Sequence, residues 1–542
     1  MIVLGLHGGV TVGQHEPAAA LAVNGKIVAL CEEERYLRIK SCYGYLPHRA
    51  IKACLKQANV KWEDINLIVA PGVTYDDFAA RWRDYLRHTF GSCPKIELVH
   101  HQKAHLAAAF YSSGLEESAC LSLDASGDGA CGMLGYATKK DGIKILDTIP
   151  TKNSLGYFYT LMTYYLGFED GDEYKVMGLA PYGKPTVDLG KLIRPVKGGW
   201  EFDWDSVRAD PMPKSPFEPL YSKKVVEALG RPNRRPDEPL ADFHRDVARS
   251  TQHVMEECFL SLVEELRRRT PGTRNLCFAG GIAMNCSANR RLLYSDSFDH
   301  IYVPPVSSDR GLALGCAYLG ATMFGDSPWQ LWDPYLGTSY SNDVVRKELE
   351  GNGCRYEEVN DPTEAGAELL AQNKILGWHQ GRSEAGARAL GNRSILANCS
   401  STQMRDLVNA RIKYREEFRP FAPAVLQEEA PAWFKTNGAT DFPYMTFTLD
   451  AVPEKAKNIA AVVHVDGTAR VQTVRSSNNE PYYELIRKYK QRTGVPVILN
   501  TSFNLKGQPI IETPRDALMT FFGCGLDALI IGNFLVRKER SL

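Results

Sequence analysis

Residues 120–129 read Cys120-Leu121-Ser122-Leu123-Asp124-Ala125-Ser126-Gly127-Asp128-Gly129, and this stretch decides the fold that we expect. An apolar strand carries Asp124 directly into a glycine-rich turn, where backbone N–H groups around Gly127 and Gly129 suit a phosphate. Apolar segments at 131–138 and 143–149 follow, joined by the turn signal Asp141-Gly142. The stretch therefore predicts a strand, a ligand-binding loop and a hairpin.

The same order of elements occurs at the start of the chain. An apolar strand enters a glycine-containing loop, and strands at 18–23 and 27–30 flank Asn24-Gly25. Two copies about 115 residues apart predict a duplicated α/β domain, with both loops facing the cleft between its halves. A helix is expected after each copy, at 47–58 and at 154–166.

A pair of histidines precedes the second copy. His101 and His105 lie four positions apart before the apolar segment 106–110, which reads as a helix entering a core. Residues at this spacing share a helix face, so the two imidazoles project together. A solvated helix start is the alternative for the pair alone. Together with Asp124, the pair suits Fe(II), Mn(II) or Zn(II) and leaves positions open for substrate.

A third strand-and-loop element follows at 276–285. Its strand runs into Gly280-Gly281 and then into a helix, whose N-terminus favours a phosphate. The segment 243–269 before it has apolar residues at helical spacing and predicts a structural helix. Asp309 stands at a later turn before an apolar helix, where by itself it favours an N-cap over a fourth metal ligand.

Length and charge exclude several classes of protein. A chain of 542 residues is too long for one ordinary core, so two or more domains are expected. Because 64 basic residues balance 64 acidic ones, we expect no general attraction to nucleic acid or membrane. The glycine-interrupted start reads as a strand and not as a signal peptide. The thirteen cysteines are scattered without a CxxC pair, which is typical of reduced, buried thiols in a cytoplasmic protein.

The composition shifts to Trp, Pro, Gly, Ser and Asn over 325–342. We place a domain boundary there, with predicted domains at 1–335 and 345–542. The second domain reads as mixed α/β, because its segments alternate between strand and helix character. These segments are a strand at 375–379, a helix at 402–413, and strands at 445–449 and 495–499.

Basic residues gather in the loops of this second domain. Residues 381–394 place three arginines, Arg388 among them, between glycines. Glycine lets the backbone approach a ligand, and the arginine fork binds phosphate or carboxylate with two hydrogen bonds. Because no matching acidic loops accompany them, these loops predict an anion site for a nucleotide and a second phosphate compound. Further candidate residues are Lys413, Arg419, Arg470, Asn500 and Ser502.

Taken in order, these motifs resemble the O-carbamoyltransferases that tailor nodulation factors and antibiotics. The resemblance covers nearly the whole chain, with two departures: the family's usual His-Asp is His15-Glu16, and Ala387 replaces a proline. The motifs are His101 with His105, Asp124, 173–181, 388–394, 418–423, 464–470 and 500–504.

The resemblance implies a fold and two sites. An N-terminal domain of the actin/sugar-kinase type, internally duplicated, would carry carbamoyl transfer, and a mixed α/β, YrdC-like C-terminal domain would form carbamoyl-adenylate. The adenylation site would hold carbamoyl phosphate and ATP through Arg388, Lys413, Arg419, Arg470, Asn500 and Ser502. Fe(II) or another divalent transition metal would bind to His101, His105, Asp124 and Asp309. The nucleotide at the transfer site would contact Gly127, Gly129, Gly280, Gly281 and Asn285.

The same resemblance implies a reaction. Carbamoyl phosphate would donate its carbamoyl group, through carbamoyl-adenylate and with ATP and Mg²⁺, to a hydroxyl of a small-molecule natural product, as in antibiotic biosynthesis. His15 would take the proton of that hydroxyl, with His7 as its competitor, and Lys40 would contact phosphate or acceptor. The expected partner is the hydroxylated acceptor, without nucleic acid or membrane, and a homodimer is left open.

Two other functions remain as alternatives. Carbamoyl transfer to a protein thiol or a tRNA base is disfavoured, because the chain lacks the zinc-finger and acylphosphatase modules of the former and a basic surface for the latter. A non-catalytic nucleotide-binding regulator is disfavoured by the intact metal ligands and the basic loops.

Overall fold

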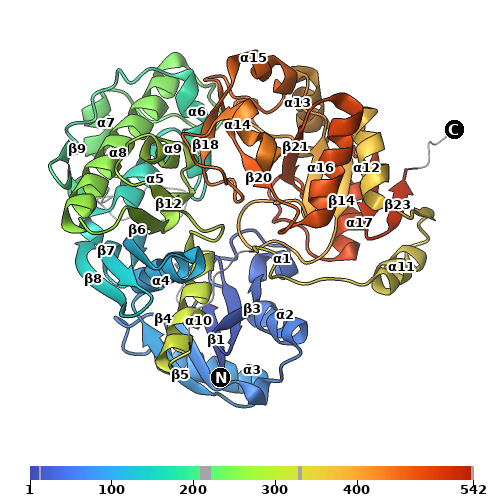
Figure 1. The fold of residues 1–542 in the computed structure, drawn as a ribbon. Helices are drawn as coiled ribbons and strands as arrows, with labels where there is room; N and C mark the ends of the chain where they lie inside the picture. The colour runs from blue at the N-terminus through green and yellow to red at the C-terminus, as the bar shows by residue number, and fades with distance from the viewer. Residues whose placement is uncertain (11–13, 208–220, 327–332, 539–542) are drawn as a thin grey trace.

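The structure, a computed structural model, describes residues 1–10, 14–207, 221–326 and 333–538. The N-terminal part of the chain forms the blue and the green lobes of Figure 1, and the C-terminal part forms the orange-to-red lobe. Each lobe contains a β-sheet and several helices. The protein is therefore mixed α/β, as the sequence predicts.

The first sheet has the strand order β3-β2-β1-β4-β5. Strand β1 pairs antiparallel with β2 and parallel with β4. Asn24 and Gly25, between β2 and β3, have φ of 49° and 76°, which a two-residue type I′ turn requires, so the predicted hairpin is confirmed. The strands are β1 (Ile2–His7), β2 (Ala18–Val23), β3 (Lys26–Glu32), β4 (Leu67–Pro71) and β5 (Lys95–Val99).

The second sheet repeats the first. Its order β8-β7-β6-β11-β12 has two antiparallel pairs followed by two parallel pairs, as the first sheet does. The predicted duplication of an α/β unit is therefore confirmed at the level of sheet topology. The strands are β6 (Glu117–Gly127), β7 (Ala130–Thr138), β8 (Gly142–Pro150), β11 (Asn275–Ala279) and β12 (His300–Tyr302).

Two helices, α4 (His101–Ser113) and α10 (Leu312–Met323), share one buried core cluster with residues of both sheets. Both helices are apolar and buried on almost every side, which is the pattern of a helix enclosed by a core. A Cβ added to Gly315 would lie 1.9 Å from the Ala104 carbonyl oxygen, so glycine permits this close crossing. Helix α4 is thus held rigidly where its first residues meet the end of β6.

The C-terminal lobe contains an eight-stranded sheet of order β13-β23-β22-β14-β15-β21-β16-β20. A three-stranded sheet, β17-β18-β19, lies beside it, and a two-stranded sheet, β9-β10, lies in the N-terminal part. The bounds are β9 (Ile193–Val196), β10 (Gly199–Phe202), β13 (Tyr356–Glu358), β14 (Leu376–His379), β15 (Arg393–Ala397), β16 (Ala422–Leu426), β17 (Phe434–Lys435), β18 (Thr448–Ala451), β19 (Thr468–Arg470), β20 (Gln472–Val474), β21 (Val497–Ser502), β22 (Ala528–Ile531) and β23 (Phe534–Arg537).

The remaining helices of the N-terminal part are α1 (Glu33–Leu37), α2 (His48–Ala58), α3 (Phe78–Phe90), α5 (Leu155–Tyr165), α6 (Glu173–Leu179), α7 (Lys223–Leu229), α8 (Asp242–Arg269) and α9 (Cys286–Leu293). Three of them, α2, α5 and α8, match the helices predicted at 47–58, 154–166 and 243–269. The helices of the C-terminal part are α11 (Asn342–Gly351), α12 (Pro362–Ala371), α13 (Thr402–Val408), α14 (Ala430–Trp433), α15 (Pro453–Ala456), α16 (Glu480–Thr493) and α17 (Pro514–Phe522).

Two predicted elements of the C-terminal part differ in the structure. The helix expected at 402–413 is α-helical only to Val408 and continues as a π-helical turn from Asn409 to Lys413. The strand expected at 445–449 begins at Thr448, because Met445 has a positive φ of 56° that no strand residue adopts. The predicted domain boundary falls partly on residues 327–332, which lie outside the described residues.

All thirteen cysteines are free thiols, and ten of them are buried, as predicted. Within the described ranges, no helix has both the length and the apolar character needed to cross a bilayer.

Candidate functional site

Four predicted ligands meet at the junction of α4 and β6. The side chains of His101, His105, Asp124 and Asp309 place one donor atom each within 4.8 Å of the others. Both imidazole Nε2 atoms lie 3.2 Å from Asp124 Oδ2 and 3.4 Å from Asp309 Oδ1. Ligand atoms about 2.1 Å from a shared ion are separated by roughly 3–4 Å, so this donor set fits one divalent transition metal.

Local structure explains why these four residues face one another. The histidines occupy the first and fifth positions of α4. Strand β6 pairs with β7 up to Leu123 and again at Gly127, and Asp124 leaves the ladder in the irregular stretch between them. Its Oδ1 accepts hydrogen bonds from the N–H groups of Ala125 and Gly281, so Oδ2 is left to face the histidines.

Asp309 reaches the cluster from a short helical turn, Asp309–Gly311, that precedes α10. Ser308, not Asp309, is the N-cap residue of this turn, although capping is the role that the sequence position of Asp309 favours. Glu16 holds this turn from both sides of Asp309: it accepts a hydrogen bond from Ser308 Oγ at 2.6 Å and pairs with Arg310. The carboxylate of Asp309 is therefore free to point at the two imidazoles.

The charges of this cluster depend on one another. Burial alone lowers the pKa of His101, but the carboxylates of Asp309 and Asp124 outweigh burial and raise the pKa to about 10. Burial raises the pKa of Asp309, and His101 and His105 reverse that shift and hold it below its ordinary value. Without a bound cation, the His101 imidazole therefore holds a proton and is charged beside the two carboxylates.

His15 lies at the edge of this cluster. Its ring centroid is 5.1 Å from that of Tyr43, whose hydroxyl donates to Asp170. Burial lowers the pKa of His15, and the carboxylates of Asp309, Glu16 and Asp124 together raise it above its ordinary value. An imidazole in this position has the charge environment of a proton acceptor.

The glycines predicted to hold a nucleotide have different surroundings in the structure. A Cβ at Gly127 would lie 2.2 Å from His101 Cγ, so this glycine lets the turn pack against the imidazole. Gly129 has a φ of 76° and no heavy atom within 4 Å of its Cβ position. Gly280 packs against the Leu123 backbone, and Gly281 donates to Asp124. Asn285 caps α9 through Ala288 N and pairs with Gln252.

The structure brings the predicted arginines together where the two lobes meet. Arg388 has no hydrogen-bond or ion-pair partner within the described part of the chain, and burial together with Arg470 lowers its pKa to about 9. Arg470 Nε is also buried without a partner, beside Cys286 of α9. Arg419 lies 4.4 Å above the ring of Tyr174, and Lys40 lies 5.2 Å from the same ring. Cations crowded in this way favour a bound anion.

Lys413 and the end of β21 form the other side of this group. Lys413 Nζ donates to the carbonyl and hydroxyl oxygens of Ser502 and to Asn504. Asn500 donates to the Ala389 carbonyl oxygen, which ties β21 to the loop of Arg388, and its own Oδ1 is buried without a partner. An unsatisfied buried oxygen is costly, and a ligand N–H group could satisfy it.

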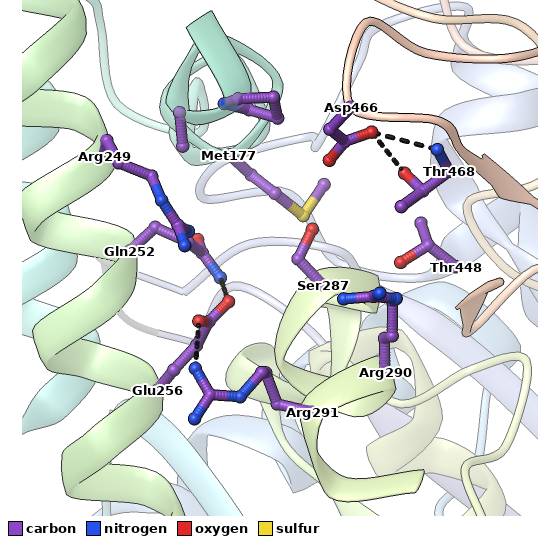
Figure 2. A pocket seen from close by; sticks show the side chains of 12 residues that line it. Met177, Arg249, Gln252, Glu256, Ser287, Arg290, Arg291, Thr448, Asp466 and Thr468 are labelled. Carbon is purple, nitrogen blue, oxygen red and sulfur yellow. Dashed lines mark hydrogen bonds and ion pairs between the residues drawn. The ribbon is translucent and has the colours of Figure 1, made fainter. Parts of the chain in front are cut away.

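A cavity of about 270 Å³ lies beside this group, between the lobes (Figure 2). Arg249 reaches into it from α8, and Figure 2 shows no hydrogen bond or ion pair between Arg249 and the other residues that line the cavity. Thr468 of β19, whose N–H and hydroxyl donate to Asp466, lines the side of the cavity opposite Arg249. Arg470 lies two residues further along that strand on the same face. The cavity is thus contiguous in the fold with the arginine group.

Two family models match this chain. One, described as the carbamoyltransferase N-terminus, matches residues 80–318, and the other, described as the carbamoyltransferase C-terminus, matches 367–538. Nodulation protein NolNO of Sinorhizobium fredii is 36% identical over 100% of this chain and 83% of its own length. This chain belongs to the carbamoyltransferase family. Nodulation protein NolO of Bradyrhizobium diazoefficiens is 37% identical, over 81% of this chain and 79% of its own.

Among solved structures, the similarity to this carbamoyltransferase is weak. HypF in its phosphate- and nucleotide-bound form has a TM-score of 0.35 and 12% identity, over 61% of this chain and 56% of its own. A ROK hexokinase from Thermus thermophilus has a TM-score of 0.30 and 14% identity, over 59% of this chain and 98% of its own. These values are too low to support an argument about fold or ligands.

Sequence reasoning missed several residues that shape the carbamoyltransferase site. The ion pair of Glu16 with Arg310 joins positions far apart in sequence, and only the departure from the family's usual His-Asp marks Glu16. Arg415 belongs to the same basic loop in the sequence but is not among the candidate site residues. It lies 4.1 Å from the ring of Phe421 and adds a further cation beside Lys413 and Arg419. Asp128 was part of a glycine-rich turn, and no local signal distinguishes a buried aspartate there from a solvated one.

Proposed function

We propose that this carbamoyltransferase is an ATP-dependent O-carbamoyltransferase. It moves the carbamoyl group of carbamoyl phosphate, through carbamoyl-adenylate, to a hydroxyl of a small-molecule natural product. The observation that carries the proposal is the presence of two different sites in a member of this family. One is a four-donor metal cluster in one lobe, and the other is a group of crowded arginines where the lobes meet, in which Arg470 Nε is buried without a partner.

The arginine group suits the first half of the reaction. Water would cleave carbamoyl phosphate into carbamate and inorganic phosphate. Carbamate would then attack the α-phosphate of ATP and expel pyrophosphate, leaving carbamoyl-adenylate. Every species in this step is an anion, and Arg388, Arg419 and Arg470 would bind their oxygens and offset their mutual repulsion. Lys413 and Ser502 would hold a phosphate at the end of β21, and Asn500 Oδ1 would accept from the carbamoyl amide.

The metal cluster suits the second half. A divalent metal bound to His101, His105, Asp124 and Asp309 would supply Lewis acidity toward the adenylate. His15 would take the proton of the acceptor hydroxyl, because an alcohol is not ionised near neutral pH and needs a base within reach. Lys40 would lie between the two sites, since it shares the ring of Tyr174 with Arg419.

The fold types implied by the resemblance belong to the same proposal. The repeated sheet topology supports an N-terminal domain of actin/sugar-kinase type, and the eight-stranded mixed sheet would be the YrdC-like, adenylate-forming domain. Gly280, Gly281 and Asn285 receive less support as nucleotide contacts, because their polar groups already bind Asp124 and α9 or pack against β6.

Incubation with ATP, Mg²⁺ and carbamoyl phosphate, without acceptor, tests the first half. Release of pyrophosphate that depends on carbamoyl phosphate is expected, whereas a nucleotide-binding regulator would release none. Arg419→Ala removes one charge-assisted contact worth about 1.5–3 kcal/mol, so the rate should fall roughly tenfold to a hundredfold. Full activity of that variant would place the pocket elsewhere.

The metal is tested in the second half. His105→Ala should abolish carbamoyl transfer and spare pyrophosphate release, because His105 belongs to the metal cluster and not to the arginine group. A purified protein without stoichiometric metal, whose transfer survives chelation, would contradict the metal site. Screening hydroxylated small molecules for a mass gain of one carbamoyl group would identify the acceptor.

A further inference from the structure

Asp128 sits in the turn between β6 and β7 and is 6% exposed, which is unusual for an aspartate in a hairpin turn. Its carboxylate accepts four hydrogen bonds. Oδ2 accepts from the N–H groups of His101 at 2.7 Å and Gly72 at 3.1 Å. Oδ1 accepts from the Thr74 N–H at 3.2 Å and the Thr74 hydroxyl at 2.8 Å. Among the described residues, no lysine or arginine forms an ion pair with it.

These four donors come from two segments that meet at the metal cluster. His101 is the first residue of α4, so its N–H has no partner inside the helix, and Asp128 supplies one. Gly72 and Thr74 lie in the loop that follows β4. One buried carboxylate therefore fixes the start of the helix that carries both histidines to a loop from the other half of the duplicated domain.

The geometry bears directly on the His101 side chain. The turn packs against that imidazole, because a Cβ at Gly127 would lie 2.2 Å from its Cγ. With the backbone held by Asp128 and the ring held by the turn, His101 Nε2 is directed toward Asp124 and Asp309. Groups that orient a ligand without touching the metal govern its affinity, because a misdirected ligand must be reordered on binding.

We propose that Asp128 is a positioning residue of the metal centre. It presets the direction of His101 before the metal arrives and ties the loop at 72–74 to the same point. The proposal rests on the metal site of the proposed function and assigns to Asp128 no contact with metal, nucleotide or acceptor. Val73 and Tyr75, each 46% exposed, flank Thr74 in the sequence. Because Asp128 anchors Thr74, these two side chains are also held at a fixed place relative to the histidines.

Asp128→Asn is the sharpest test. Asp128 has a φ of 53°, and asparagine tolerates this left-handed conformation as aspartate does, so the substitution adds no backbone strain. Whichever way the amide is oriented, its NH₂ group faces two N–H or O–H donors in place of an acceptor. The matched control is Asp141→Asn, in the exposed Asp141-Gly142 turn of the next hairpin, where the carboxylate bonds only to Thr138 among the described residues.

The primary measurement is the affinity of the apo-protein for Zn²⁺ alone, and for Fe²⁺ under anaerobic conditions, in competition with a chromophoric chelator. Loss of a group that orients a ligand typically weakens metal binding by about tenfold to a hundredfold, and Asp128→Asn should do so. Asp141→Asn should bind as wild type does. The melting temperature of the apo-protein should fall, because buried donors lose their acceptor, so both assays are run at a temperature where the variant is folded. Pyrophosphate release should then stay near wild type, whereas a general loss of structure would lower it together with the metal affinity.

Thr74→Val is the second variant, in case Asp128→Asn does not fold. It removes one of the four hydrogen bonds at the far side of the carboxylate and should weaken metal binding several-fold, whereas Thr74→Ser should restore it. Wild-type metal affinity in both Asp128→Asn and Thr74→Val would overturn the proposal. Failure of the wild-type protein to bind either metal would overturn the metal site itself, and with it the role of Asp128.

Discussion

At the scale of single residues, two histidines compete for the role of base. His7 Nε2 lies 3.0 Å from the His15 carbonyl oxygen, so it donates its proton there and offers no lone pair at that atom. Burial, with a smaller opposing effect of Asp309, lowers the pKa of His7 to about 4, which keeps the ring neutral. His15 instead lies at the edge of the cluster with a raised pKa. His15 therefore stays the proposed base, and His7, whose Nδ1 is buried without a partner, stays its competitor.

His15→Asn should therefore reduce acceptor carbamoylation by about a hundredfold or more, because general-base catalysis contributes about this much. Formation of carbamoyl-adenylate should persist, and pre-formed adenylate should not rescue transfer. Product mass spectrometry and pyrophosphate assays measure the two halves separately. Normal transfer in His15→Asn, together with failure of His7→Asn, would assign the base to His7.

The buried amine of Lys413 leads us to expect that the protein takes up protons when it binds an anion. Burial, and then Arg415 and Arg419, hold its pKa well below the ordinary value for lysine. A bound anion stabilises the ammonium and raises the pKa again, so binding of carbamoyl phosphate should take up part of a proton. At pH values between the pKa of Lys413 in the free protein and its higher pKa in the complex, the affinity for carbamoyl phosphate should therefore fall as pH rises.

Calorimetry in buffers of different ionisation enthalpy measures this uptake. Lys413→Arg is the control, because arginine keeps the charge and does not titrate in this range. The extra uptake should disappear in that variant. Equal proton uptake in the two proteins would show that Lys413 is already charged in the free site.

At the scale of elements, the crossing of α10 over α4 holds the metal-binding histidines. Gly315→Ala would place a Cβ 1.9 Å from the Ala104 carbonyl oxygen, and rigid backbone cannot yield as a side chain would. We expect a loss of about 1–3 kcal/mol in the free energy of unfolding, as for other overpacked cores. Urea unfolding measures it.

The matched control for this crossing is Gly351→Ala in α11, where no heavy atom lies within 4 Å of the added Cβ. It should be neutral or stabilise slightly, because alanine is the better helix former. If both variants unfolded at the same urea concentration, α4 and α10 would not be in the close contact described above.

At the scale of the whole molecule, a set of buried polar contacts joins the lobes near both sites. Arg382 of the C-terminal lobe donates to the Val28 carbonyl oxygen at 2.9 Å, and Glu32 of the N-terminal lobe accepts from the Gly386 N–H. Arg35 donates to the Gly386 carbonyl oxygen at 2.8 Å. These contacts hold the loop of Arg388 against β3 and α1, and they add to other contacts between the lobes, which include ion pairs and a shared apolar cluster.

Arg382→Ala should loosen this junction. If carbamoyl-adenylate passes between the sites without entering bulk water, more of it should then be lost to hydrolysis. We expect the ratio of pyrophosphate released to acceptor carbamoylated to rise several-fold. Arg194→Ala, which removes an exposed ion pair with Glu201 within one hairpin, should leave the ratio unchanged. An unchanged ratio in Arg382→Ala would mean that the junction does not guide the intermediate.

Local patterns in the sequence were sufficient for most elements and for part of the site. Asn24-Gly25 predicts a turn because both residues tolerate positive φ, and His101 with His105 predicts a shared helix face from spacing alone. The repeat of strand, loop and hairpin predicts the duplication that the two sheets confirm. Each of these conclusions depends on interactions between residues a few positions apart, which the order of amino acids states directly.

Tertiary structure decided the rest, because those features depend on contacts between distant segments. The local pattern around Asp309 favours a cap, and the ligand role came only from the resemblance of the whole chain to a family. Its 3.4 Å approach to two histidines about 200 positions earlier, which no local pattern could give, supports the ligand role. Gly281 and Asn285 were predicted as nucleotide contacts. In the folded chain the Gly281 N–H donates to Asp124, and the Asn285 side chain accepts from Ala288 N of α9. No local pattern indicates the role of Asp128. The four groups that donate hydrogen bonds to its carboxylate belong to two segments that lie far from it in sequence and meet only in the folded chain.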